Sequence, residues 1–324
     1  MPDMSRIAKA VEMRRNKETQ ANSESVSLNE STEVEPEPTA KVLKKAVTHP
    51  QPSFDKESEK MAKKIAFVNP KGGSTKSTVA ANTATYLAQQ KGLSVLLVDL
   101  DSQADASVLS GINMKEKSIY EMYSPYESGH MFEDNFKMPS ELVIGTEYGF
   151  DIIPGGVLLN RAESWITDAT PGQHHLYNIF DKDDELGDYD FILVDTHGFR
   201  NKTLISSLIL VDDVIVPTVP GELSTRHQEE LFSLIEAVNQ LRYGRPSLEL
   251  RAVVVNRLKK SSKAGMLSYG ELRESSSEKW YVAENYLPES ELVTNAEKLH
   301  RPVMSSGTKQ AFNRSFSNLM EEIF

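Results

Sequence analysis

The chain has 324 residues, of which 36 are basic and 47 acidic, so its formal net charge is −11. This excess of acid disfavours bulk adhesion to nucleic acid, because contacts to phosphate need clustered lysine and arginine. The absence of cysteine excludes disulfides, thiolate metal sites and cysteine nucleophiles. No window is apolar for 18 residues and the N-terminus lacks a secretion signal, so we expect a cytoplasmic protein that does not enter a membrane.

Residues 1–63 differ in composition from the rest and predict a largely disordered N-terminal arm. They are rich in Glu, Lys, Ser, Thr and Pro, and such a stretch buries too little apolar surface to offset the entropy of ordering. Residues 4–15 are the exception, because their apolar side chains recur at helical spacing and predict a short amphipathic helix. Two interpretations stay open for it: a helix that forms only transiently, and a docking helix for a partner or for DNA.

From residue 64 onward, short apolar runs alternate with segments of helix length. Nearly continuous apolar strands indicate a parallel sheet that is covered on both faces. Residues 64–324 are therefore expected to form a doubly wound α/β domain with a mostly parallel sheet. Residues 111–149 and 261–300 are less periodic, so no helix or strand is predicted there. The predicted strands are Lys64–Asn69, Ser94–Leu100, Phe150–Ile153, Phe191–Val194, Val211–Val216 and Leu250–Val255, and the predicted helices Ser77–Gln90, Gln228–Leu241 and Phe312–Ile323.

A glycine-rich loop follows the first predicted strand and opens the first predicted helix. In that position, backbone N–H groups and the N-terminus of the helix can hold a phosphate. Lys76 is placed to reach the β- and γ-phosphates of a nucleotide, and the Ser77 hydroxyl is placed to hold Mg²⁺. The loop departs from the strict consensus, because Pro70 and Thr75 occupy its two glycine positions.

This loop resembles the deviant Walker A loop, K-G-G-x-G-K-S/T, of the ParA/MinD family of P-loop ATPases. The resemblance implies that Lys71 crosses a dimer interface to the nucleotide of the other subunit. Thr75 stands where the family has its last glycine, which allows close approach of the backbone to phosphate. Either Thr75 crowds the loop and weakens nucleotide binding, or the loop has adapted to it. The residues that the resemblance assigns to ATP binding here are Gly72, Gly73, Ser74, Thr75, Lys76, Ser77 and Thr78.

A second motif, VLLVDLDSQADAS, ends a predicted strand with two carboxylates. Asp99 and Asp101 occupy alternate positions and are expected to face the same way, at the strand end where α/β sheets bind ligands. The motif resembles D-x-D-P-Q of the ParA/MinD family, with Ser102 in place of the proline. The resemblance implies that Asp101 orients the attacking water.

Two further strand ends complete the resemblance, which covers residues 64–324. The run DFILVDTHG resembles a Walker B strand and implies that Asp195 reaches Mg²⁺ through water, while His197 receives no catalytic role. The run VVVNR resembles the strand whose end contacts adenine. Asn256 is the candidate there, because a side-chain amide can both donate to and accept from a base edge.

The resemblance favours the ParA-like partition branch. The absence of cysteine excludes the iron–sulfur bridge of nitrogenase relatives, and the acidic C-terminal helix does not suit a membrane surface. The branch implies an ATPase that forms an ATP-dependent homodimer and drives partition of a plasmid or chromosome, or positions other large cargo. Hydrolysis is expected to be slow and stimulated by a ParB-like DNA-binding partner.

Contact with non-specific DNA would need a local basic patch. Arg257, Lys259, Lys260 and Lys263 lie within seven residues with no acid between them, and a solvated loop is the equally weighted alternative. If the patch binds DNA, the protein associates with the nucleoid. A competing function is a nucleotide-sensing scaffold with little turnover that binds a partner through the N-terminal arm. Thr75 favours the scaffold, whereas the intact lysine, serine and aspartates of the three motifs oppose it.

Overall fold

The computed structural model describes residues 61–69, 75–112, 118–123, 136–166, 170–198, 202–221, 225–277, 280–307 and 310–324. All of them lie in the second of two units of the chain, Thr48–Phe324. Residues 1–60 of the predicted N-terminal arm, with the predicted helix, fall outside the described residues, as do Lys71, Gly72, Gly73 and Ser74. Of the helices in the described ranges, none is long and apolar enough to cross a membrane.

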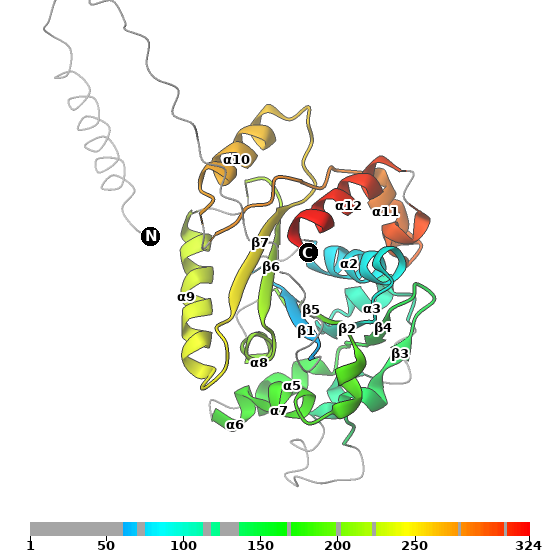
Figure 1. Ribbon diagram of the computed structural model, residues 1–324, viewed down its shortest axis with the longest axis vertical. Coiled ribbons are helices and arrows are strands. Elements are labelled where there is room, and N and C mark those ends of the chain that lie inside the picture. Colours follow the sequence, from blue (N-terminus) through cyan, green and yellow to red (C-terminus); the bar gives the residue numbers. More distant parts are fainter. Residues whose placement is uncertain are drawn as a thin grey trace, which may run out of the picture. The chain divides into compact units, whose positions relative to one another are not determined.

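Within the described residues, seven strands form one sheet in the order β3-β4-β2-β5-β1-β6-β7 (Figure 1). Neighbouring strands run parallel, except that β3 pairs antiparallel with β4 at one edge. This arrangement confirms the predicted doubly wound, mostly parallel α/β fold. The strands are β1 Lys63–Phe67, β2 Val95–Leu100, β3 Ile144–Gly145, β4 Asp151–Ile153, β5 Phe191–Thr196, β6 Asp213–Thr218 and β7 Glu249–Val255.

Helices cover both faces of the sheet, so the central strands are buried on both sides. The helices are α2 Lys76–Lys91, α3 Asp105–Leu109, α5 Leu159–Trp165, α6 Thr170–Gln173, α7 His175–Phe180, α8 Lys202–Leu210, α9 Thr225–Leu241, α10 Lys263–Glu274, α11 Glu291–Lys298 and α12 Ala311–Ile323. Short 3₁₀ turns lie at Ile119–Met122, Pro139–Leu142, Asp184–Asp188 and Val303–Ser306.

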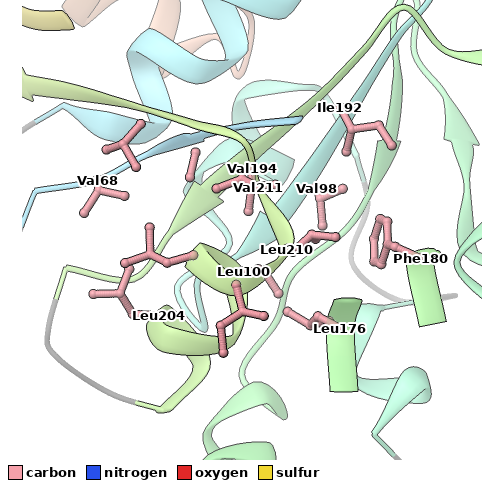
Figure 2. Packing of buried hydrophobic residues seen from close by; sticks show 14 of the residues in the cluster. Val68, Val98, Leu100, Leu176, Phe180, Ile192, Val194, Leu204, Leu210 and Val211 are labelled. Carbon is pink, nitrogen blue, oxygen red and sulfur yellow. The ribbon is translucent and has the colours of Figure 1, made fainter. Parts of the chain in front are cut away.

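Two apolar clusters, one on each face, hold the layers together. One cluster joins β-strand side chains to α2, α11 and α12. The other joins them to α7, α8 and α9. Figure 2 shows the second cluster, to which Val98 and Val194 of the sheet, Leu204 of α8 and Phe180 of α7 belong. Burial of apolar area on both faces is the dominant stabilisation of such a sheet.

Strand register brings carboxylates to one edge of the sheet. Asp99 of β2 is the register partner of Asp195 of β5, and Phe67 of β1 pairs with Asp195 on the other side. In a parallel sheet the carboxyl ends of all strands meet at the same edge. The segments that follow β1, β2 and β5 therefore converge on one place.

Two arginines fix the C-terminal end of α8. The last carbonyl groups of a helix lack partners within the helix, and cations are favourable there. Arg242, which is buried, donates to the carbonyl oxygens of Leu208 at 3.0 Å and Ile209 at 3.1 Å, and also to that of Val211. Arg245 donates to the carbonyl of Ile209 and, at 3.2 Å, to that of Leu210. Both arginines lie just after α9, so the segment that follows α9 anchors the end of α8.

Candidate functional site

A cavity of about 380 Å³ opens where the segments after β1, β2, β5 and β7 converge. The site thus lies outside the carboxyl ends of the strands, the usual ligand position in open α/β sheets. The described residues that line it are Thr75, Lys76, Ser77, Thr78, Asp101, Gln103, Asp105, Val108, Leu109, His197, Gly198, Arg257 and Glu297.

The N-terminus of α2 forms one wall of the cavity. The helix begins at Lys76, and the Val79 N–H donates to the carbonyl of Thr75 at 3.0 Å as its first turn closes. The first turn contains no acidic residue, so nothing in it offsets the positive end of the helix dipole. The Thr78 hydroxyl donates to Glu297 of α11 at 3.0 Å and ties the two helices together. The predicted nucleotide-binding residues from Thr75 to Thr78 therefore share one wall.

Thr75 has a backbone conformation that is unusual for its residue type. Its φ is 66° and its ψ is 23°, which is the left-handed region. For a β-branched residue this region is a genuine outlier. The side chain does not cap α2, and its hydroxyl instead accepts a hydrogen bond of 2.6 Å from Nδ2 of Asn256. The geometry gives a physical reason why glycine suits this position, because glycine adopts positive φ without penalty.

Asp99 and Asp101 both lie at the end of β2 but have different surroundings. Asp99 is fully buried, and its carboxylate accepts from the Asp101 N–H at 3.0 Å, the Ser107 N–H at 2.8 Å and the Ser107 hydroxyl at 2.7 Å. Burial raises the pKa of Asp99 to about 6, although the hydrogen bonds from Ser107 and Asp101 oppose that shift. Asp101 lines the cavity and accepts from the Gln103 N–H at 2.9 Å. Asp99 therefore holds the loop that presents Asp101.

Gly155 packs against the same loop. The Ser107 hydroxyl, which donates to Asp99, also accepts from the Gly155 N–H at 3.1 Å. A Cβ atom at Gly155 would lie 2.7 Å from the Asp101 carbonyl oxygen and 2.9 Å from Cγ and the carbonyl oxygen of Asp99. A Cβ atom essentially never makes contacts that short, so only glycine fits without a backbone shift. The loop after β4, the end of β2 and helix α3 thus form one tightly packed unit.

Asp195 lies at the end of β5, beside Asp99. It is fully buried, and in the described part of the chain neither carboxylate oxygen makes a hydrogen bond of ordinary geometry. Burial raises the pKa of Asp195 well above its usual range and the charge of Asp99 adds to the effect, while Lys76 and the Ser77 hydroxyl oppose it. A buried carboxylate whose oxygens lack hydrogen bonds of ordinary geometry is costly, so the site is suited to a cation or to water held by one.

His197 and Gly198 follow β5 into the cavity. Nε2 of His197 lies 3.9 Å from Oδ1 of Asp101, which is too far for a hydrogen bond. The structure therefore places His197, which received no catalytic role from its position in the sequence, beside Asp101.

The segment after β7 forms another part of the cavity wall. Asn256 is only 3% exposed, whereas Arg257 lines the cavity and, like Thr75, has a left-handed φ, here 54°. All four residues of the predicted basic cluster, Arg257, Lys259, Lys260 and Lys263, are exposed. Glu289, which lies outside that stretch of sequence, contacts the cluster in space: its carboxylate pairs with Lys259 at 2.5 Å.

Sequence reasoning missed several residues at this site. Ser107 and Gly155 hold the Asp101 loop, and Glu297 reaches the cavity from α11. Ser107 stands in the same run as the two aspartates, so its proximity to them could have been a signal. Gly155 and Glu297 come from segments without a motif, and only the fold brings them here.

The chain is similar in sequence and in fold to several known proteins. The model of the AAA domain family matches residues 62–249. The chromosome partitioning protein ParA of Caulobacter vibrioides is 24% identical over 261 residues, which cover 80% of this chain and 92% of that protein. A plasmid partition protein from Borrelia burgdorferi has a TM-score of 0.61 at 20% identity, covering 81% of this chain and 97% of that one. A cobyrinic acid a,c-diamide synthase from Mycobacterium smegmatis, with a bound ATP analogue and magnesium, has a TM-score of 0.61 at 22% identity and covers 74% and 93%.

The two solved structures establish the fold, and the difference between their functions means that the fold alone does not decide the activity. The family match carries more weight, because it spans more than half of the chain and includes the phosphate loop, Asp101 and Asp195. The chain therefore belongs to the AAA domain family, as a P-loop ATPase of the ParA/MinD type.

Proposed function

We propose that this chain binds MgATP in the cavity and hydrolyses it to ADP and phosphate. The observation that carries the proposal is the position of Asp195. It is buried with neither oxygen in a hydrogen bond of ordinary geometry among the described residues, close enough to Lys76 and Ser77 at the N-terminus of α2 for both to lower its pKa. A hydrated Mg²⁺ usually keeps several waters and binds through few carboxylates together with substrate phosphates. Asp195 would hold such a hydrated ion through water, and the Ser77 hydroxyl would bind it directly.

Each side chain would then have a defined task. Lys76 and the first N–H groups of α2 would bind the phosphates, and Asp101 would orient water for attack on the γ-phosphate. When bound, Mg²⁺ would neutralise part of the negative charge that develops on the transferred phosphoryl group. Phosphoryl transfer needs little covalent chemistry from the protein, so positioning by these groups accounts for most of the catalysis.

At the cellular level, we infer a ParA-like partition function. The protein would form a homodimer with ATP, in which Lys71 of each subunit contacts the nucleotide of the other, and a ParB-like partner would stimulate slow hydrolysis. The named relative, matched over most of both chains, supports this proposal. Plasmid, chromosome or other large cargo would be moved by cycles of dimer assembly and release.

Non-specific DNA would bind to the basic cluster defined above. Its residues are exposed, but the ion pair between Lys259 and Glu289 reduces the charge that is available to phosphates. Binding should need ATP and should weaken steeply with salt. Changing Lys259, Lys260 and Lys263 together to Glu should abolish DNA binding and leave ATP affinity unchanged. Full DNA affinity in that variant would exclude the cluster and direct attention to residues 1–20.

A second candidate function, a nucleotide-sensing scaffold with little turnover, has one observation in its favour. Thr75 occupies a strained left-handed conformation at the phosphate loop. A site of this kind could bind nucleotide and change shape without efficient hydrolysis. Steady-state hydrolysis with and without DNA distinguishes the two candidates, because the scaffold predicts little turnover under both conditions and the partition ATPase predicts stimulation.

The direct test of the proposal compares two lysines of the same helix. Lys76→Ala should lose nucleotide binding, measured by calorimetric titration with an ATP analogue and Mg²⁺. Lys91→Ala is the matched control, since Lys91 ends α2 and pairs with Glu321 away from the cavity. Unchanged affinity and turnover in Lys76→Ala would refute the proposal. Lys71→Ala should bind nucleotide as a monomer, and light scattering with ATP measures that.

A further inference from the structure

Asn256 connects two parts of the molecule that lie far apart in sequence. Its Nδ2 donates to the Thr75 hydroxyl at 2.6 Å, and its Oδ1 accepts from the Arg257 N–H at 2.7 Å. Its own backbone N–H donates to the Thr218 carbonyl at 2.7 Å, which fixes it at the end of β7 beside β6. The buried side-chain amide of Asn256 therefore holds two segments: Thr75 at the start of α2, and Arg257 at the start of the loop after β7.

The hydrogen bond from Asn256 matters because the backbone of Thr75 is strained. Left-handed φ is disfavoured for a branched side chain, and such a conformation persists only where the surrounding structure imposes it. A threonine before a helix usually caps it with its hydroxyl, but this hydroxyl makes no cap and accepts from Asn256 instead. The amide of Asn256 is thus a contact that stabilises the strained conformation.

Asn256 is poorly placed to read a base. It is 3% exposed, and the described side chains that line the cavity include its neighbour Arg257 but not Asn256 itself. Its nitrogen and its oxygen both bond to protein atoms already. A contact with adenine would require the amide to turn away from Thr75.

We propose that Asn256 is a positioning residue, which holds Thr75 in its left-handed conformation and so directs the first N–H groups of α2 toward the phosphates. The part of this inference that concerns nucleotide rests on the proposed function. The contact itself does not, because it exists between protein atoms alone.

A double-mutant cycle tests the pair. Thr75→Val keeps the branched shape and removes the hydroxyl, and Asn256→Ala removes the donor. Contacting residues couple, whereas independent ones contribute additively. The matched control is Thr78→Val combined with Asn256→Ala, since the Thr78 hydroxyl lies in the same cavity but donates to Glu297. Each cycle is measured by denaturant unfolding without nucleotide and by affinity for AMPPNP with Mg²⁺.

The expected result is coupling in the Thr75 cycle only. Each single variant should weaken affinity for AMPPNP by roughly three- to ten-fold, and the double variant should be no weaker than the worse single variant, which is a coupling of about three-fold or more. Preference for AMPPNP over its guanine counterpart should not change in Asn256→Ala, because the residue does not touch the base.

Two results would overturn the inference. Additive losses in unfolding would show that Asn256 does not hold Thr75. Loss of the preference for adenine in Asn256→Ala, with that preference kept in Thr75→Val, would make Asn256 a base contact. If the parent bound no nucleotide at all, the proposed function would be refuted, and the unfolding cycle would still decide whether Asn256 holds Thr75.

Discussion

The two sides of the cavity are held in different ways. On the side of β2 and β5, strand register sets the carboxylates side by side, and the Asp99 carboxylate, the Ser107 hydroxyl and the Gly155 backbone lock the loop that carries Asp101. On the side of β7, Thr75 at the start of α2 has a strained backbone and accepts a hydrogen bond from Asn256.

The first side keeps the aspartates of the ParA/MinD family motifs, whereas the second side has Thr75 where the family has its last glycine. A side built from several buried bonds and a close backbone contact resists change, because removing any member leaves buried polar groups unpaired. On the other side, relief of the backbone strain at Thr75 can offset the loss of a contact. We therefore expect changes near Asp101 to affect catalysis and folding strongly, and changes at Thr75 to adjust affinity.

The largest expected effect comes from Asp101→Asn. Under the proposed role of Asp101, this variant should bind MgATP normally, but its single-turnover hydrolysis should fall by about 100-fold or more, as for other positioned acid–base groups. Asp105→Asn is the control, because Asp105 lines the same cavity without an assigned role in the reaction. Equal losses in the two variants would contradict a specific role for Asp101.

The next effect concerns the packing of Gly155. Gly155→Ala should lower the free energy of unfolding by about 2 to 3 kcal/mol, because the added methyl group meets backbone atoms that cannot move independently. Gly187→Ala is the control, since nothing lies within 4 Å of a Cβ atom there. Denaturant unfolding measures both, and similar stabilities would mean that the loop accommodates the methyl group.

Ser107→Ala is expected to reduce the free energy of unfolding by a smaller amount that depends on pH. The raised pKa of Asp99 means that its proton is bound below about pH 6, so the stability linked to that proton is present in acid and lost as pH rises through 6. Above pH 6 the Ser107 hydroxyl donates to a charged carboxylate, and such bonds are the stronger ones. The free energy of unfolding of Ser107→Ala should therefore fall by about 1.5 kcal/mol at pH 8 and by clearly less at pH 5.

The control for this change is Ser110→Ala, because Ser110 is also buried but donates to the neutral carbonyl of Ala106. Its loss of stability should be the same at both pH values. Unfolding in the absence of nucleotide and Mg²⁺ measures the two variants. A loss in Ser107→Ala that does not vary with pH would contradict the assigned protonation of Asp99.

The smallest effect separates the strain at Thr75 from its hydrogen bond. Thr75→Gly and Thr75→Val both remove the hydroxyl, but only glycine relieves the left-handed strain. Thr75→Gly should therefore bind MgATP about five-fold more tightly than Thr75→Val, a difference of roughly 1 kcal/mol. Calorimetric titration decides, and weaker binding by Thr75→Gly would show that the threonine side chain itself supports the loop.

Much of the sheet could be predicted from the sequence, because buried parallel strands are nearly continuous apolar runs. Every predicted strand corresponds to one in the structure, although β6 begins at Asp213, two residues after the predicted start. Helix α10 escaped prediction because none of its residues is buried, so it has no apolar stripe to detect. Helix α8, KTLISSLIL, is apolar on most sides and gives no helical period.

The candidate site was predictable where one motif carries several residues. The first turn of α2 and the carboxylates of β2 and β5 were found in this way, and Thr75 to Thr78, Asp101 and Asp195 meet at one edge of the sheet. Contacts between distant segments could not be predicted. Thr75 and Asn256 are 181 positions apart, and Gly155 reaches Ser107 from 48 positions away.

The two arginines at the end of α8 have a mechanical consequence. Their hydrogen bonds pin the carbonyl groups of Leu208, Ile209 and Leu210 to the segment after α9. The other end of α8 begins at Lys202, four residues beyond Gly198 at the cavity. The C-terminal end of α8 is therefore held by side chains from another segment, and its N-terminal end lies near the cavity. Since most residues of α8 are buried, the helix joins the edge of the cavity to the packed face of the sheet as one rigid element.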